Sequence, residues 1–289
     1  MYRFVPYDKI EKNKWNGTVH YALNGNVFGY YWYLKAVIGE WDAIVEEDYQ
    51  SVMPVLNRPL KSYQYELLKE LGPYSVNPLT DQRVGDMLEL LEKHNRSSQY
   101  PIHSDVSRRQ INAYNHSLRH KSVLQGGTVY KELFKTYSDE LTKNLNEEGY
   151  DAIKVAASLK PETLVGLLNE NDQYKNALMR VMYNAMHRGI GFSSAIEDRS
   201  TGKILAASFF INANTTMHEI LSYSKGGKKY RQLIFDLMLR NSSGSPLRFE
   251  TFYNVNILHE MGFDSEPVFD LQLKSSTMTN LLKSFGRAY

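Results

Sequence analysis

The chain has 289 residues, of which 42% are hydrophobic and 23% charged, with a net charge of +2. This length predicts two domains, each with its own core, and the small net charge does not indicate a nucleic-acid-binding protein. Cysteine is absent, which excludes disulfides, catalytic thiolates and cysteine-ligated zinc. The N-terminal segment lacks the apolar core of a signal peptide, and no run of about 18 apolar residues is present to span a membrane. We therefore expect a cytoplasmic protein.

The first half of the chain alternates short strands with helices. Residues 41–46 and 49–54 predict two strands of a tight hairpin. Thr80 has the side chain of a helix N-cap, and the residues from 81 to 94 place their apolar members on one face, which predicts a helix. Further elements are expected at residues 2–6 (a strand), 8–15 (a helix) and 28–37 (an aromatic helix).

The middle of the chain predicts a domain boundary. Residues 110–128 are polar and have no clear periodicity, so we expect domains over residues 1–120 and 121–289. Beyond this region the pattern becomes regular again. Its expected elements are an amphipathic segment from Tyr130 to Leu145, a strand at 151–155 and helices at 161–169 and 174–187.

The last hundred residues carry the strongest pattern. The loop at residues 224–229, Ser-Lys-Gly-Gly-Lys-Lys, opens a predicted helix. Free backbone N–H groups and the helix dipole make such a position favourable for a phosphate, although a solvated turn explains the same letters. Around it we expect strands at 191–197, 203–211, 217–223 and 249–252, and a short helix within 254–263.

This order of strand, glycine loop, helix, strand and short helix resembles the acyl-CoA-binding half of a GNAT-type N-acetyltransferase domain. Residues 41–54 resemble the opening domain of FemAB-like proteins of the Bacteroidetes type, and residues 130–149 resemble the entry into their second domain. The resemblance implies an α+β (α/β) fold with two tandem GNAT-like domains in a bacterial protein. Each domain would be a mixed, mostly antiparallel sheet flanked by helices.

The resemblance also implies an activity. It points to an N-acyltransferase that uses acetyl-CoA or another acyl-CoA, whose acyl group is attacked directly by the amine of a small molecule or peptide. Two alternatives stay open. The donor is instead an aminoacyl-tRNA, as in FemAB-like aminoacyltransferases, or the chain is a non-catalytic binding module. We expect no metal, because His116 and His120 have zinc-ligand spacing but lack the glutamate of a metalloprotease helix.

The expected donor site is the glycine loop and its surroundings. Backbone amides near its glycines would hold a diphosphate, and its lysines would add positive charge. The loop keeps the glycines of the GNAT pattern but not their spacing. The residues implied are Leu221, Ser224, Lys225, Gly226, Gly227, Lys228, Lys229 and Asn254.

Three residues are candidates for catalysis. Glu219 lies on the strand that carries a general base in many GNAT enzymes, with an exposed surface glutamate as the alternative. Many such enzymes also place a tyrosine four residues before the glycine corresponding to Gly262, and here that position is Leu258. Tyr223 and Tyr253 are therefore the candidate proton donors, because a phenol with a pKa of about 10 is protonated at neutral pH.

Overall fold

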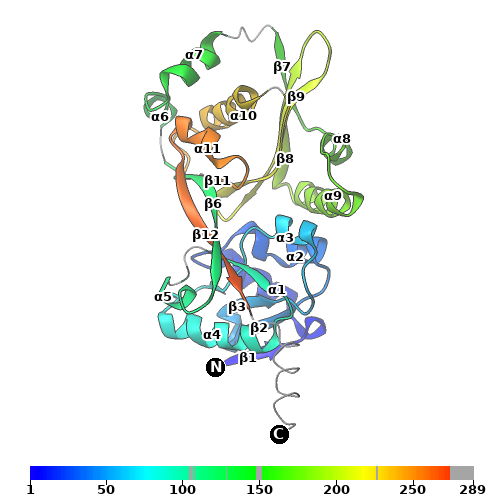
Figure 1. Cartoon of the computed structure of the whole chain (residues 1–289), viewed down its shortest axis with the longest axis vertical. Helices are drawn as coiled ribbons and strands as arrows, with labels where there is room; N and C mark the ends of the chain where they lie inside the picture. Colours follow the sequence, from blue (N-terminus) through cyan, green and yellow to red (C-terminus); the bar gives the residue numbers. More distant parts are fainter. Residues whose placement is uncertain (104–105, 107, 128, 148–151, 226, 274–289) are drawn as a thin grey trace. The chain divides into compact units, whose positions relative to one another are not determined.

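The computed structural model describes residues 1–103, 106, 108–127, 129–147, 152–225 and 227–273. Two compact units are formed, one by Met1–Arg119 with the described residues after Glu266, and the other by His120–Glu266 (Figure 1). The limits of the units fall within strands β6 (His116–Leu124) and β12 (Asp264–Gln272), so both strands contribute to both units. The division into domains 1–120 and 121–289 stays a proposal.

The first unit contains an antiparallel sheet with the strand order β1-β2-β3-β4. The expected helix at 81–94 is confirmed, and the Thr80 hydroxyl accepts a hydrogen bond from the Arg83 N–H at 3.3 Å. The elements of the first unit that lie before β6 are β1 (Tyr2–Val5), η1 (Tyr7–Lys9), α1 (Lys12–Tyr21), η2 (Val27–Gly29), α2 (Tyr31–Val37), β2 (Asp42–Glu46), η3 (Glu47–Tyr49), β3 (Ser51–Val55), α3 (Ser62–Leu67), β4 (Tyr74–Ser75), α4 (Asp81–His94), β5 (Gln99–Ile102) and α5 (Arg108–Ile111).

The helix expected at residues 8–15 is wrong in its bounds. A 3-10 turn at Tyr7–Lys9 precedes α1, which begins only at Lys12 and continues to Tyr21. The reason is the spacing of the buried face, because Trp15, Thr18 and Val19 are the residues that α1 turns towards the core. A window that stops at Trp15 contains only the first of them.

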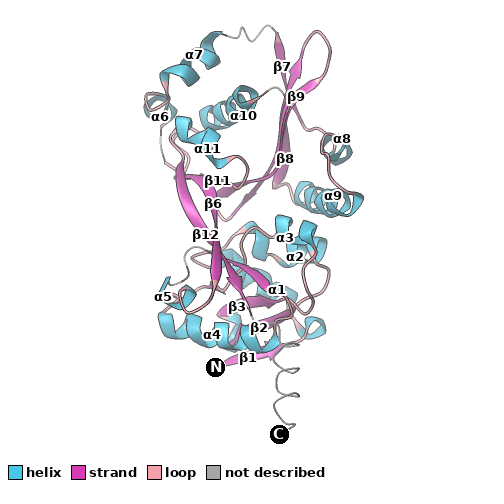
Figure 2. Cartoon of the chain, viewed as in Figure 1, coloured by secondary structure: helices cyan, strands magenta, loops and turns pink. Residues whose placement is uncertain are grey.

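The second unit is built on most of a mixed sheet, of which β5 and parts of β6 and β12 belong to the first unit. Strand order over the described residues is β5-β12-β6-β11-β10-β9-β8-β7, and β10 and β11 are parallel while the neighbouring pairs are antiparallel (Figure 2). The remaining elements are α6 (Tyr130–Phe134), α7 (Asp139–Glu147), β7 (Ile153–Ala157), α8 (Pro161–Gly166), α9 (Asp172–His187), β8 (Gly191–Asp198), β9 (Ile204–Ala213), β10 (Thr216–Ser224), α10 (Lys228–Asn241), β11 (Arg248–Thr251), α11 (Val255–Leu258) and η4 (His259–Met261).

Helices cover both faces of this sheet. Phe209 and Phe210 are consecutive on β9, so they point to opposite faces. Phe210 belongs to the cluster under α10, where its ring centroid lies 5.7 Å from that of Phe235. Phe209 instead lies on the side of α9, next to Gly191, where a Cβ would come within 2.6 Å of the Ala185 Cβ. The glycine at position 191 thus lets α9 approach β8 closely.

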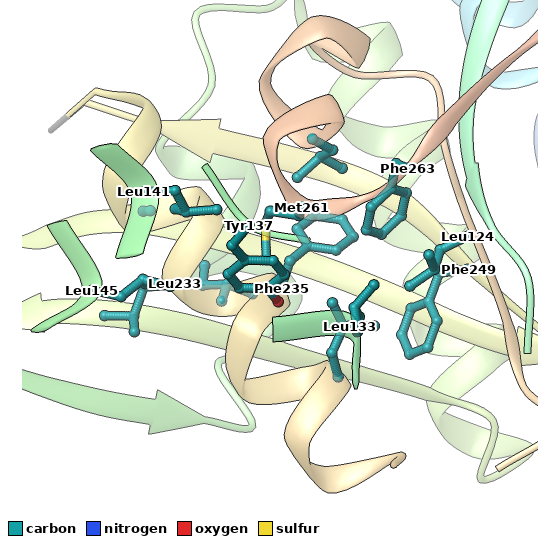
Figure 3. Close-up of a cluster of buried hydrophobic side chains, with 14 of the residues drawn as sticks. Leu124, Leu133, Tyr137, Leu141, Leu145, Leu233, Phe235, Phe249, Met261 and Phe263 are labelled. Carbon is teal, nitrogen blue, oxygen red and sulfur yellow. The ribbon is translucent and has the colours of Figure 1, made fainter. Parts of the chain in front are cut away.

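The core under α10 gathers apolar side chains from distant parts of the second unit (Figure 3). Leu133 and Leu141 come from α6 and α7, Phe249 from β11 and Phe263 from the turn before β12. The rings of Phe235 and Phe263 meet edge to face at 5.6 Å. This cluster fixes α10 on the sheet, and with it the loop at which α10 begins.

Candidate active site

The parallel pair β10–β11 separates in the middle of β10. Its pairs run from Thr216 with Arg248 to Glu219 with Thr251, where β11 ends, while β10 continues to Ser224. At the same level Ile220 is an extra residue, because β10 shifts its register against β9 between Glu219 and Leu221. Such a bulge bends a strand and interrupts its ladder. We call the point formed by Glu219, Ile220 and Thr251 the fork.

Glu219 lies inside the fork and is only 2% exposed. Its Oε2 accepts hydrogen bonds from Arg231 Nη2 at 2.6 Å and from the Thr251 hydroxyl at 2.5 Å, and its Oε1 accepts one from the Ser208 hydroxyl at 2.6 Å. The alternative of an exposed surface glutamate is therefore wrong. The carboxylate of Glu219 is thus ion-paired and accepts hydrogen bonds on both oxygens. Its role as a general base stays a prediction.

Tyr253 reaches into the fork from the segment after β11. Its hydroxyl donates to the Ile220 carbonyl at 2.5 Å, and its N–H donates to the Thr251 hydroxyl oxygen at 3.1 Å. Tyr253 is half-buried and thus lies between the interior and the surface. Tyr223 is also half-buried, but it is placed further along β10, opposite Ala207 of β9. Of the two candidate proton donors, Tyr253 is the one whose hydroxyl contacts the bulge.

The glycine loop joins β10 to α10. The Ser224 hydroxyl donates to the Gly227 carbonyl at 2.5 Å, and the Lys225 N–H donates to the Leu205 carbonyl at 2.9 Å. Gly227 has φ of +86°, which other residues rarely adopt. Its chain neighbours apart, no heavy atom of the described residues lies within 4 Å of where its Cβ would stand. The loop thus has open space beside the start of α10. Gly226 lies outside the described residues.

The loop lysines differ in their surroundings. Lys228 is paired with carboxylates, because its Nζ lies 2.9 Å from Glu260 Oε1 and 3.3 Å from Glu140 Oε1. The hydrogen bond from Lys228 lowers the pKa of Glu260, and the same bond raises the pKa of Lys228. The Nζ of Lys229 lies 4.8 Å from the centre of the Tyr230 ring. Lys225 is exposed. Lys228 is therefore paired with two carboxylates of the protein itself.

Helix α11 is tied to α10 by polar contacts. The amide of Gln232 donates from Nε2 to the Ile257 carbonyl and to Glu260 Oε2, both at 3.0 Å. Asn254 precedes α11 in the left-handed region, with φ of +42°, and its side chain is exposed. Leu258 is wholly buried in the core under α10. The position of the usual tyrosine therefore carries a packing residue.

Leu221, the remaining predicted donor residue, is 1% exposed and pairs with Phe209 of β9. Its neighbour Ile220 is 3% exposed, so the strand is buried on both of its faces at the fork. A ligand would meet Leu221 only after a local change in packing.

Sequence reasoning missed the residues that hold Glu219 in place. Arg231 is 0% exposed, and Ser208 and Thr251 are equally buried. One signal was present, because an arginine four residues after Gly227 falls three positions before Ile234 and thus on the apolar face of α10. A charge on such a face indicates a buried ionic partner.

Other kinds of site find no support in the described part of the chain. No group of three or more His, Asp or Glu residues there is arranged to hold a metal ion. None of the described helices combines the length and apolar character needed to cross a lipid bilayer. A pocket beside α10 is lined by Leu141, Leu145, Lys229 and Leu233. It therefore adjoins α7, whereas Arg231 and Gln232 of α10 face the fork and α11.

The residues present suit the diphosphate end of an acyl-CoA, the donor expected from the sequence. No acidic residue occurs in the first turn of α10, so its N-terminal dipole is not offset within the helix. Lys225 is exposed and belongs to the same loop as Gly227, beside whose Cα there is open space. At the other end, the fork presents the Tyr253 hydroxyl beside the bulge.

Neither a protein-family model nor a curated protein matches the chain. Solved structures do match over nearly its whole length. A crystal structure of FemX has a TM-score of 0.61 at 9% identity and covers 94% of this chain and 98% of its own. A conserved protein of unknown function from Bacteroides thetaiotaomicron has a TM-score of 0.59 at 10% identity, over 93% of this chain and 100% of its own. A tandem GNAT protein from the clavulanic acid biosynthesis pathway has a TM-score of 0.53 at 9% identity, over 93% and 97%.

At these identities the likeness shows the fold. The sheets with flanking helices confirm the α/β, tandem GNAT-like fold class expected from the sequence. The expectation of a mixed sheet in each domain holds only for the eight-stranded sheet, because the pairs of the four-stranded sheet are all antiparallel. The Bacteroidetes-type assignment stays a prediction. The chain has a tandem GNAT-like fold, similar to the solved structures of FemX and of the tandem GNAT protein.

Proposed function

We propose that the chain is an N-acyltransferase that uses acyl-CoA, acetyl-CoA first among the candidates, to acylate an amine by direct attack. The observation that carries the proposal is the fork. A parallel strand pair that ends at a bulge, beside a glycine loop at a helix N-terminus, offers one end for a diphosphate and another for the reacting group. A bacterial, cytoplasmic setting is part of the same proposal.

The loop would hold the donor. Backbone N–H groups at the start of α10 would bind the diphosphate, and Lys225 and Lys229 would add charge to them. Lys228 would contribute once it exchanges Glu260 for phosphate. We keep Gly226, Ser224, Leu221 and Asn254 as proposed donor contacts. When bound, the donor supplies the thioester whose acyl group is transferred.

Tyr253 is the proposed proton donor. In the transfer, the amine nitrogen forms a bond to the acyl carbon while the carbon–sulfur bond breaks, and the sulfur takes up a proton. The Tyr253 hydroxyl gives its hydrogen bond to the Ile220 carbonyl, so it would have to turn away from that carbonyl to pass its proton to the leaving sulfur. Tyr223 is the second candidate. Glu219 is the proposed acceptor of the amine proton.

The acceptor proposed is the amine of a small molecule or a peptide. The enzyme's contribution would be mainly positioning, because no covalent enzyme intermediate is involved. A donor of the aminoacyl-tRNA type remains the alternative from the same fold, and it predicts binding of charged tRNA in place of CoA.

One observation favours a second candidate function, a non-catalytic binding module. The fork is crossed by the chain's own hydrogen bonds, from Arg231 to Glu219 and from Tyr253 to Ile220, and Leu258 stands where a tyrosine is usual. A module of this kind binds its ligand without turnover.

Steady-state acetyl transfer to a panel of amines and peptides tests the proposal, with CoA affinity measured alongside. We expect turnover in the wild type and a loss of at least about tenfold in kcat for Tyr253→Phe, with affinity little changed. Wild-type turnover in both Tyr253→Phe and Tyr223→Phe would remove these phenols from the mechanism. Tight CoA binding without turnover in the wild type would support the binding module.

A further inference from the structure

Among the described residues of the second unit, Arg231 is the largest charged side chain that is completely buried. Neither the glycine-loop motif nor the proposed chemistry gives it a role. A guanidinium in the interior is costly unless its N–H groups are paired with good geometry. Arg231 meets this requirement with partners from β10, from β11 and from the segment between β11 and α11, and the first two are the strands that form the fork.

The first contact is with β10. Arg231 Nη2 donates to Glu219 Oε2 at 2.6 Å, and Nε lies 3.4 Å from Oε1. The two contacts come from different nitrogens and reach different oxygens, so they fix the plane of the guanidinium as well as its position. Below it, the Cζ atom lies 5.3 Å from the centre of the Phe235 ring.

The other contacts are with the last residue of β11 and with the segment that follows it. Arg231 Nη2 lies 3.2 Å from the Thr251 hydroxyl oxygen, and Nη1 lies 3.4 Å from the Asn254 carbonyl. The same Thr251 oxygen accepts the N–H of Tyr253. Tyr253 thus lies between two residues that the one guanidinium contacts.

The conformation of this segment explains why it needs support. Asn254 has φ of +42°, in the left-handed region that non-glycine residues seldom occupy. This turn redirects the chain from β11 into α11 immediately after Tyr253. The hydrogen bond from Arg231 Nη1 to the Asn254 carbonyl stabilises this turn. The turn then fixes the backbone beside Tyr253 and with it the direction of the Tyr253 side chain.

We propose that Arg231 is a positioning residue that couples the first turn of α10 to the segment Thr251–Asn254 and thereby holds the Tyr253 hydroxyl at the bulge. Its role as an aid to catalysis rests on the function proposed above for Tyr253. The coupling itself follows from the contacts of Arg231 and does not depend on that function. Since α10 begins at the glycine loop, a change at the loop is transmitted through Arg231 to the phenol.

The chain offers a conservative variant and a matched control. Arg231→Lys keeps the charge but replaces a planar group having five N–H donors with a single ammonium, which cannot reach Glu219, Thr251 and Asn254 together. Arg240→Lys makes the same exchange near the other end of α10, where Arg240 pairs with Asp236 at 2.8 Å.

The position of the phenol can be read without activity. We would incorporate 3-fluorotyrosine at position 253 and record its fluorine resonance in the full chain. Arg231→Lys is expected to shift and broaden this resonance, whereas Arg240→Lys leaves it unchanged. An unchanged resonance in a folded Arg231→Lys protein would overturn the proposal. If that variant does not fold, Thr251→Val, which removes the shared hydroxyl, is read in the same way.

Kinetics provide the second readout. With turnover in the wild type, Arg231→Lys is expected to lower kcat by about tenfold or more while the KM for acetyl-CoA changes less than about threefold, which indicates loss of an interaction made in the transition state. Equal losses in Arg231→Lys and Arg240→Lys would mean a merely structural role and would contradict the proposal. A wild type without turnover counts against the proposed function, and the fluorine measurement still decides the role of Arg231.

Discussion

Glutamine at position 219 would leave the shape of the fork almost unchanged but remove the negative charge that faces Arg231. Both side chains are nearly inaccessible, with exposed fractions of 2% for Glu219 and 0% for Arg231. In the Glu219→Gln variant, the guanidinium would keep its charge in the interior without a counter-ion. The NH₂ group of the new glutamine would also point at one of the donors of Arg231, Ser208 or Thr251, which in the wild type all donate to the Glu219 carboxylate.

The magnitude follows from the burial. Removing one partner of a buried ion pair costs about 3–5 kcal/mol, against less than about 1 kcal/mol for an exposed pair. For a domain of roughly 150 residues, 1 kcal/mol moves the melting temperature by about 2–4 °C. We therefore expect Glu219→Gln to lower it by about 6 °C or more. The surface pair of Lys135 with Glu132, at 2.7 Å, provides the control, and Glu132→Gln is expected to change the melting temperature little.

The assay is urea unfolding followed by circular dichroism, together with thermal melting. The double variant Glu219→Leu with Arg231→Met should lose less stability than the sum of the two single changes, because it removes both charges together. A Glu219→Gln protein within about 0.5 kcal/mol of the wild type would refute the reasoning, since it would mean that the ion pair is hydrated or absent.

Three further outcomes follow from the same contacts. Gly227→Val is expected to weaken CoA binding by at least about tenfold, because the loop requires φ of +86°. The control is Gly244→Val, at φ of +71° beyond the other end of α10, which should cost similar stability without changing CoA affinity. Equal CoA affinities of the two variants in calorimetry would place the site elsewhere. Glu260→Gln should tighten CoA binding about two- to threefold, because it removes one of the two carboxylates that compete with the phosphates for Lys228, and weaker binding would contradict this. A titration followed by the carboxyl resonance of Glu260 should show that its pKa is lowered in the folded protein. The contribution of Glu260 to folding stability is then complete above its ordinary pKa of 4.5 and is lost as the pH falls through the lower folded value. A normal pKa would count against the Lys228 contact.

Much of the fold was predictable because its signals are local. The helix at Asp81–His94 has its cap and its apolar face in consecutive residues, and both were read correctly. The strand β10, the loop and α10 were also placed within a residue or two. These elements carry their own period or turn chemistry, which does not depend on distant partners.

Strand β6 was missed because its reason lies elsewhere in the chain. Residues 116–124 are polar enough to suggest a linker, yet Lys121 and Ser122 are buried there. Lys121 pairs with Glu250 of β11 at 3.2 Å, and the Ser122 hydroxyl donates to the Val255 carbonyl at 2.8 Å. Polar strands of this kind are stabilised by partners that no local window contains.

The candidate site divides in the same way. The loop and its glycines were visible as a motif, whereas the burial of Glu219 was not, because Arg231 reaches it from another element. A strand glutamate looks the same in sequence whether it faces water or a guanidinium. The bulge at Ile220 has no sequence signal either, since it is defined by the register against β9.

The most direct test of the proposed donor site is calorimetric titration of the 289-residue chain with acetyl-CoA, with CoA and charged tRNA as comparisons. Saturable one-to-one binding of acetyl-CoA and of CoA is expected, and both should be lost in Gly227→Val. No binding of either compound to the wild type would contradict this expectation. Binding of charged tRNA alone would transfer the donor role to aminoacyl-tRNA.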